Sequence, residues 1–259
     1  MTFLFNEFVY RPIYNLLIFL YNVIPLHDFG IAIILVTIII KFFLIPLSRK
    51  QIESQKKMQE LQPKLKAIQD KYKKDKEQQT KAVMAFYKEN KANPFSGCLP
   101  LIFQMVFLIA IYRVLYNISQ NDLMVNGSDL YSFIYNPGQI NRLFLNIMDL
   151  SSMGVDFKNI NPSNIAHIIV VIAAAGAQYF QTKLLMATAK KDVAVVDKKD
   201  NKEPDFAQIM SKQMLYLAPA MTLFIGIKFS AGLALYWLVS TLFMIVQQKQ
   251  LEKMKKVKV

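Results

Sequence analysis

Long runs of apolar residues, separated by polar segments, dominate the pattern of the chain. Each run is close to the roughly 20 residues that an α-helix needs to cross the hydrocarbon core of a bilayer. The last two runs are separated only by the short segment IKFSAG, so we expect them to form a tight helical hairpin. The pattern predicts an all-α membrane protein with five transmembrane helices, at 30–48, 93–118, 163–186, 213–229 and 230–248.

The polar segments between the runs differ strongly in charge. Segment 49–92 carries 13 Lys and Arg against six Asp and Glu, 183–212 carries seven lysines, and the tail 249–259 carries five. Segment 119–162 has only two basic residues against four aspartates. Because basic segments stay on the cytoplasmic side, we expect 49–92, the connector 187–212 and the tail in the cytoplasm. The N-terminus and the loop 119–162 are then expected outside.

The first segment, 1–29, is apolar and aromatic but is interrupted by Pro12, Pro25 and several polar residues. It predicts an amphipathic helix in the outer interface, anchored by its tyrosines. A sixth span is the alternative interpretation. Segment 1–29 shows neither a small-residue cleavage site nor an early cysteine, so we expect no cleavable signal peptide and no lipid anchor.

Segment 49–92 combines high charge with a regular apolar pattern. Apolar residues recur at spacings of 3, 4, 3 and 4, which is typical of a coiled-coil seam, and Pro63 predicts a kink or a restart. A second helix should follow, so the segment is expected to form a basic helical hairpin. It could be a solvated hairpin without a partner, or an electrostatic dock for anionic lipids or ribosomal RNA without sequence-specific recognition. The residues that carry this pattern are Met58, Leu61, Leu65, Ile68 and Tyr72, followed by Val83, Phe86 and Tyr87.

Composition supports a membrane protein and argues against several other classes. Hydrophobic residues make up 54% of the 259 residues, yet the net charge is +13, which fits apolar spans joined by basic loops. The single cysteine, Cys98, excludes an intramolecular disulfide and is expected to be a packing residue, and the two histidines lie far apart. Since no metal-binding or nucleotide-binding motif is present, we expect no cofactor and a physical rather than a covalent activity.

Lys41 lies inside the first span, where a charge costs roughly 2.5–3.5 kcal/mol on insertion scales. It could extend towards the headgroups, because it lies six residues, or about 9 Å, before Leu47, where the apolar run ends. An ion pair within the membrane is not available, since the five predicted spans contain no Asp or Glu. The third interpretation is that Lys41 faces a wet groove and that its acidic partner arrives with a substrate.

Other polar residues are predicted at a depth similar to that of Lys41. Each of the other spans places an amide or a hydroxyl in the cytoplasmic half, so these groups could converge on one polar cavity open to the cytoplasm. Ordinary helix packing is the alternative, because such side chains also join membrane helices. Trp237 could anchor the last span at the interface or line the upper wall of the groove. The candidate groove residues are Lys41, Gln104, Gln178, Gln181, Thr222, Trp237 and Thr241.

Four stretches of the chain resemble the YidC/Oxa/Alb family of membrane protein insertases. The run IILVTIIIKFFLIPLSRKQIESQKKMQELQPKLKAIQDKYK is similar to the first span and hairpin of that family, and NPFSGCLPLIFQMVFLIAIY is similar to its second span. YFQTKL and SAGLALYWLVSTLFMIVQQ resemble the end of its third span and its last span. The resemblance covers nearly the whole chain in order, and it indicates a short bacterial form without the large extracytoplasmic domain of many members.

The resemblance implies an insertase and chaperone in the bacterial plasma membrane. Nascent membrane proteins would be its substrates, and a ribosome, a Sec-type channel and anionic lipids its further partners. The family usually has arginine in place of Lys41, proline in place of Ser230 and asparagine in place of Thr241, and its pattern favours Gln181 as the groove residue of the third span. A small-solute or ion transporter and a passive scaffold for ribosome recruitment are the alternatives, although no inverted repeat is visible.

Overall fold

The computed structural model describes residues 2–93, 99–192 and 206–257. Most of this part of the chain is helical, so the prediction of an all-α membrane protein is confirmed. The expected packing role of Cys98 and the middle of the expected connector 187–212 lie outside the described residues. The elements are α1 (Thr2–Phe5), the π-helical η1 (Asn6–Tyr10), α2 (Arg11–Val23), the 3-10 helix η2 (Pro25–His27), α3 (Phe29–Phe43), α4 (Ile45–Lys71), α5 (Lys76–Glu89), α6 (Leu99–Gln120), β1 (Leu143–Phe144), β2 (Met148–Asp149), α7 (Pro162–Asp192), α8 (Phe206–Lys228) and α9 (Ala231–Val257).

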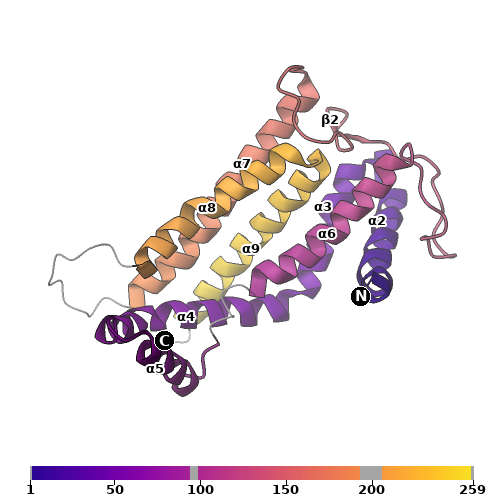
Figure 1. Cartoon of the computed structure of the whole chain (residues 1–259). Helices are drawn as coiled ribbons and strands as arrows, with labels where there is room; N and C mark the ends of the chain where they lie inside the picture. Colours follow the sequence, from indigo (N-terminus) through magenta and orange to yellow (C-terminus); the bar gives the residue numbers. More distant parts are fainter. Residues whose placement is uncertain (1, 94–98, 193–205, 258–259) are drawn as a thin grey trace.

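The helices form a bundle with two distinct ends (Figure 1). The axes of five helices lie roughly along one line in the bundle, namely those of α3, α6, α7, α8 and α9. Helix α9 packs against α3, α6 and α7. The hairpin of α4 and α5 closes one end of the bundle, here called the hairpin end, and the loop between α6 and α7 covers the other, the loop end. Among the described residues, Pro162–Leu185 and Ala231–Met254 are long and apolar enough to cross a membrane. The bent pair of α3 and the start of α4 makes a third candidate if it is counted as one span.

A sharp bend separates α3 from α4. Asp28 caps the start of α3, because its side chain accepts a hydrogen bond from the Ile31 amide at 3.0 Å. The helix ends at Phe43, five residues before the end of the predicted span, and α4 leaves at an angle of 68°. Pro46 lies in the first turn of α4, where its missing N–H costs nothing and its fixed φ favours a new helix. Lys41 therefore lies in the last turn of α3 rather than deep within a longer span.

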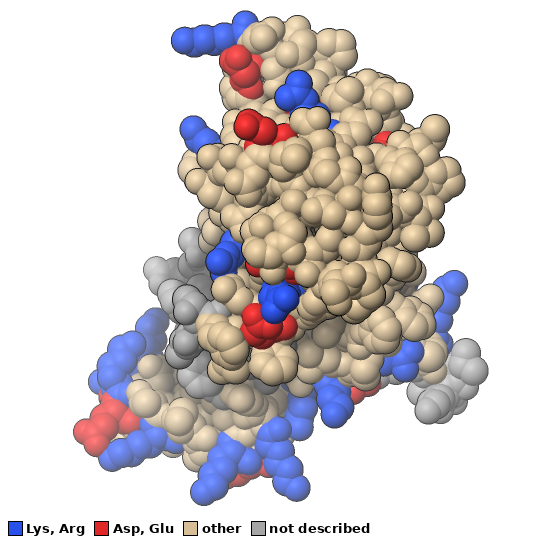
Figure 2. Space-filling view, turned by 90° about the vertical axis from the view of Figure 1, so that its right-hand side faces the viewer, with Lys and Arg blue, Asp and Glu red and all other residues tan. Residues whose placement is uncertain are grey.

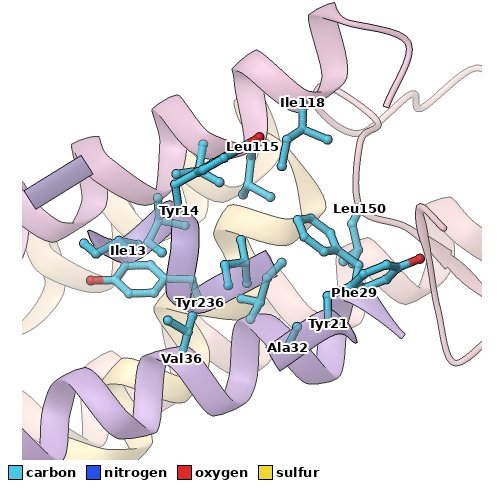
Figure 3. Packing of buried hydrophobic residues seen from close by; sticks show 14 of the residues in the cluster. Ile13, Tyr14, Tyr21, Phe29, Ala32, Val36, Leu115, Ile118, Leu150 and Tyr236 are labelled. Carbon is cyan, nitrogen blue, oxygen red and sulfur yellow. The ribbon is translucent and has the colours of Figure 1, made fainter. Parts of the chain in front are cut away.

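The largest apolar core joins the N-terminal helix to α3, α6 and α9. Figure 3 shows side chains of these helices pointing towards one another, together with Leu150 from the loop end. Gly232 at the start of α9 is part of this contact, because a Cβ there would lie 3.1 Å from the side chain of Leu115. Close approach of α9 to α6 thus depends on a residue without a side chain.

Helix α2 packs against α3 and α6 through one face, formed by Ile13, Tyr14, Asn15, Leu17, Ile18 and Tyr21. Its opposite face is apolar but exposed, as Phe19 and Val23 show. Residues 126–136 of the long loop, here called the strap, run along α2. Asn15 donates to the Asp129 carbonyl at 2.8 Å, and Asn22 donates to the Tyr135 carbonyl at 2.6 Å.

The loop end is also attached to the turn between α8 and α9. The Gly154 amide donates to the Phe229 carbonyl at 3.1 Å, and the Val155 amide donates to the Ile227 carbonyl at 2.9 Å. Gly154 has a φ of +79°, and a Cβ at this position would lie 3.1 Å from the Ile227 oxygen. Glycine is therefore required here by both the backbone conformation and the close contact.

The predicted basic hairpin is present as α4 and α5. Helix α4 continues through Pro63 as one helix, and α5 begins at Asp75, whose side chain accepts from the amides of Glu77 and Gln78. The apolar residues of the predicted seam are half-buried, whereas most of the lysines are exposed. Figure 2 shows Lys and Arg gathered at the hairpin end, below a broad surface with few charges.

Candidate functional site

Lys41 meets Gln104 between α3, α6 and α9. The Lys41 Nζ donates to the Gln104 Oε1 at 2.9 Å. The same oxygen accepts from the Ser240 Oγ at 3.2 Å, and the Gln104 Nε2 donates to the Tyr236 Oη at 3.4 Å. These four residues are here called the Lys41 cluster. Tyr236 and Ser240 are only 2% and 1% exposed, so they form the closed wall of the cluster.

The local sequence explains how three helices supply this cluster. Tyr236 and Ser240 are four residues apart on α9, so they lie on one face of that helix. Lys41 lies in the last turn of α3, where the partial negative charge of the helix terminus favours a cation. Gln104 lies one turn into α6 and reaches both neighbours. The cluster is therefore located towards the hairpin end of the bundle.

The candidate residues on α7 lie against α9 and form separate pairs. The Trp237 indole N–H donates to the Gln178 Oε1 at 3.5 Å. Gln181 is 7% exposed, and its amide nitrogen lies 3.5 Å from the Met244 sulfur. These pairs join α7 to α9, whereas the Lys41 cluster joins α9 to α3 and α6.

The two predicted threonines are buried and do not join the Lys41 cluster. Thr222 is 2% exposed, donates to the Ala218 carbonyl one turn earlier on α8, and lines a small hollow with Trp237. Thr241 is 3% exposed. Among the described residues, no hydrogen bond links Lys41 or Gln104 to Gln178, Gln181 or either threonine. The structure thus brings together two of the seven candidates around the charge, and it places the others along the α7 and α8 side of α9.

Sequence reasoning missed three polar residues of the bundle. Tyr236 and Ser240 were hidden because hydroxyl side chains are common in membrane helices and carry little signal alone. Arg113 was a clearer signal, since it is a charge inside the apolar run of α6. Its guanidinium donates to the Asn6 Oδ1 at 2.9 Å and lies 5.4 Å from the ring centroid of Tyr10. Arg113 therefore faces the N-terminal helix, away from the Lys41 cluster.

A large hollow of about 850 Å³ lies between α7 and α9. Its floor on α7 is formed by small residues, and its walls are apolar, with Phe180 and Leu242 largely exposed. Two lysines, Lys183 and Lys249, lie on its border. The hollow is lined by Ala173, Gly176, Ala177, Phe180, Lys183, Leu184, Leu238, Leu242, Ile245 and Lys249. Its size and apolar lining suit a helical or acyl-chain surface better than a small polar solute.

The start of α4 is fixed to the end of α9. The Gln247 Nε2 donates to the Ser48 Oγ at 2.5 Å and to the Ile45 carbonyl at 3.3 Å. Two turns further along α4, Lys56 pairs with Glu252 at 3.7 Å, although the Lys56 side chain is only 7% exposed. These contacts hold the α3–α4 bend beside the Lys41 cluster. Within the described residues, no group of three or more His, Cys, Asp and Glu side chains could hold a metal ion.

Comparison with known proteins identifies the family. The family described as "60Kd inner membrane protein" matches residues 19–258, which is nearly the whole chain. The chain belongs to this family. A similar relative is "Membrane protein insertase YidC" of Fusobacterium nucleatum, which is 31% identical over 244 residues, covering 93% of this chain and 96% of that protein.

Other family members are similar over most of this chain but are longer. The Wolinella succinogenes protein of the same name is 30% identical over 96% of this chain, which spans 38% of that protein. The Streptomyces avermitilis protein is 30% identical over 85% of this chain, which spans 50% of that protein. The chain thus spans half or less of these two relatives and nearly all of the Fusobacterium relative.

Proposed function

We propose that this chain is a membrane protein insertase and chaperone, the activity named for its relatives. The observation that carries the proposal is the contact of Lys41 with Gln104 at 2.9 Å. A cation on an apolar helix is here paired with a neutral amide rather than with a carboxylate. No carboxylate pairs with Lys41 among the described residues, so its charge is available to an acidic group of a substrate.

The proposed topology has five spans, formed by α3, α6, α7, α8 and α9. Helix α6 has 22 residues, which at a rise of 1.5 Å per residue gives about 33 Å, enough to cross a hydrocarbon core of about 30 Å. The apolar part of α8, Leu215–Lys228, is shorter. The lysine-rich hairpin end supports a cytoplasmic location for α4, α5 and the C-terminus. The loop end then lies outside the cell. The proposed location of the protein is the plasma membrane of a bacterium.

The N-terminal helix is proposed to lie in the outer interface rather than to form a sixth span. The strap that runs along α2 carries polar side chains, among them Asn126, Ser128 and Asp129. These groups and the strap backbone need water or headgroups, because unpaired polar groups are costly in hydrocarbon. The exposed aromatic residues Phe133 and Tyr135 suit an interfacial location.

In the proposed mechanism, the protein shortens the apolar path that a polar segment of the substrate must cross. Lys41 attracts acidic residues of a substrate tail or loop into the cytoplasmic half of the bundle. The apolar segment of the substrate then lies along the hollow between α7 and α9 and passes into lipid, favoured by about 25 cal/mol per Å² of apolar surface. Gln178, Gln181 and Trp237 would line the path between these two regions.

The basic hairpin and tail are proposed to receive the substrate at the membrane surface. Their lysines suit anionic lipid headgroups and a ribosome, and action beside a Sec-type channel is compatible with this arrangement. The lysines on the border of the hollow, Lys183 and Lys249, would lie at the same cytoplasmic surface. No nucleotide or metal enters the proposal.

The test is insertion by purified protein in sealed vesicles of a single-span substrate whose translocated tail carries aspartates. We expect Lys41→Glu to reduce the insertion rate by more than about tenfold, because it replaces attraction with repulsion, and Lys41→Arg to retain it. Ile38→Val, a neighbouring change on α3, is the matched control. Equal rates for wild type and Lys41→Glu would contradict the proposed role of the groove.

A further inference from the structure

The amide of Gln104 is held by hydrogen bonds to three neighbours. Its oxygen accepts from Lys41 at 2.9 Å and from Ser240 at 3.2 Å, and its nitrogen donates to Tyr236 at 3.4 Å. An ammonium group can only donate, so a flipped amide would place its NH2 group against Lys41 and lose this bond. Lys41 therefore sets the orientation of the amide, while the hydroxyls of Ser240 and Tyr236, which can donate or accept, hold it in position.

The Gln104 oxygen lies where the oxygen of an acidic side chain would bind Lys41. The amide oxygen of glutamine is an sp² acceptor, like the oxygen of a carboxylate, but it carries no full charge. A carboxylate adds the Coulomb attraction of a full negative charge to the hydrogen bond from an ammonium, which a neutral amide cannot supply. Gln104 thus occupies the place beside Lys41 that an acidic side chain would occupy more strongly.

We propose that Gln104 is a stand-in for the substrate carboxylate, displaced from Lys41 when an acidic side chain enters, and that Ser240 and Tyr236 are positioning residues that hold its amide in place. This inference rests on the proposed insertase function. A neutral stand-in keeps Lys41 oriented in the resting protein and yields to a charged competitor. When the substrate leaves, the same amide takes the ammonium back.

The inference predicts a specific defect for the variant Gln104→Glu. The glutamate has nearly the same shape but supplies a permanent carboxylate. The carboxylate of an incoming substrate then binds Lys41 no more strongly than this side chain does, so it no longer displaces it. Two substrates are compared that differ only in the translocated tail, with two aspartates or two asparagines. We expect the acidic-to-neutral ratio of insertion rates to fall about tenfold, the effect of losing one charge-assisted contact.

Two further variants complete the experiment in the same reconstituted vesicles. Gln120→Glu makes the identical change at the exposed loop end of α6, and we expect it to leave the ratio unchanged. Gln104→Ala removes the stand-in without adding a charge, and we expect the ratio to stay at or above that of wild type. A fall of the ratio in Gln104→Ala would show that Gln104 itself binds the substrate, which would overturn the inference.

The outcomes separate this inference from the proposed function. If wild-type protein inserts neither substrate faster than protein-free vesicles do, the proposed function fails. If wild type inserts both and Gln104→Glu leaves the ratio unchanged, only the stand-in role of Gln104 is wrong.

The positioning role of Ser240 has its own readout, the acylation rate of the Lys41 amine by a membrane-permeant reagent. Loss of the Ser240 hydroxyl should loosen the Gln104 amide and raise this rate about threefold, as expected for one neutral hydrogen bond. Ser240→Thr restores a hydroxyl and should return the rate to that of wild type. An unchanged rate in Ser240→Ala would show that Ser240 is only a packing residue.

Discussion

Lys41 and Arg113 are both cations on apolar helices, but their surroundings differ. Arg113 is covered by the N-terminal helix, with a hydrogen bond to Asn6 and the rings of Phe5 and Tyr10 at 5.6 and 5.4 Å. Within the described ranges, Lys41 bonds to the neutral amide of Gln104, which two buried hydroxyls hold in place. Arg113 is thus a structural contact between α6 and the N-terminus, whereas Lys41 keeps its charge available for a partner from outside.

The sharpest test of this contrast removes each charge in turn. Lys41→Met should reduce the insertion rate of an acidic-tail substrate about 10- to 100-fold, since hydrogen bonds to charged groups contribute roughly 1.5–3 kcal/mol. Arg113→Met should leave the rate per folded molecule within about twofold, because Arg113 faces away from the groove. Rates are measured in vesicles and normalised to the amount of folded protein. A comparable loss of insertion rate for Arg113→Met would contradict the proposed difference between a structural Arg113 and a substrate-binding Lys41.

Stability should show the opposite order for the same two residues. We expect Arg113→Met to lower the free energy of unfolding by about 1–2 kcal/mol, through loss of the Asn6 hydrogen bond and the ring contacts. The measurement is unfolding of the purified protein in detergent, followed by circular dichroism. Lys41→Met should cost less, because it also removes an uncompensated charge from an apolar helix. A larger loss for Lys41→Met would give Lys41 the structural role instead.

The smallest expected effect concerns the pair of Arg113 and Asn6. A double-mutant cycle with Asn6→Ala and Arg113→Met should give a coupling energy of about 0.5–1 kcal/mol. A cycle of Arg113→Met with Gln120→Ala, which lies at the end of the same helix, provides the uncoupled reference. Additive effects in the first cycle would show that the 2.9 Å contact contributes nothing to stability.

Apolar pattern and charge were enough to predict the helical membrane class and the basic hairpin. The pattern also predicted that Lys41 and Gln104 are groove residues, because they lie six and five residues from the ends of their apolar runs, at Leu47 and Leu99. It could not pair them with Tyr236 and Ser240, since which face of α9 meets α6 is decided by tertiary packing. The end of α3 at Phe43 was equally hidden, because apolar residues continue through the bend.

The contacts of the N-terminal helix were beyond any local pattern. Asn15 bonds to the carbonyl of Asp129, 114 residues away, and Tyr10 meets Asn117, 107 residues away. Nothing in the spacing of these residues marks them as partners, since each is only one polar group in an aromatic or polar stretch. Contacts between residues so far apart in sequence can be identified only from the three-dimensional arrangement of the helices.

The bend at Leu44 makes α3 and α4 into a lever with unequal arms. Helix α4 has 27 residues, so at 1.5 Å per residue its tip lies about 40 Å from the bend, while Lys41 lies about 4.5 Å from it on the other side. Rotation about the bend would move the tip roughly nine times as far as the lysine. Gln247 and Glu252 of α9 hold the first turns of α4, so this rotation is resisted at the pivot itself.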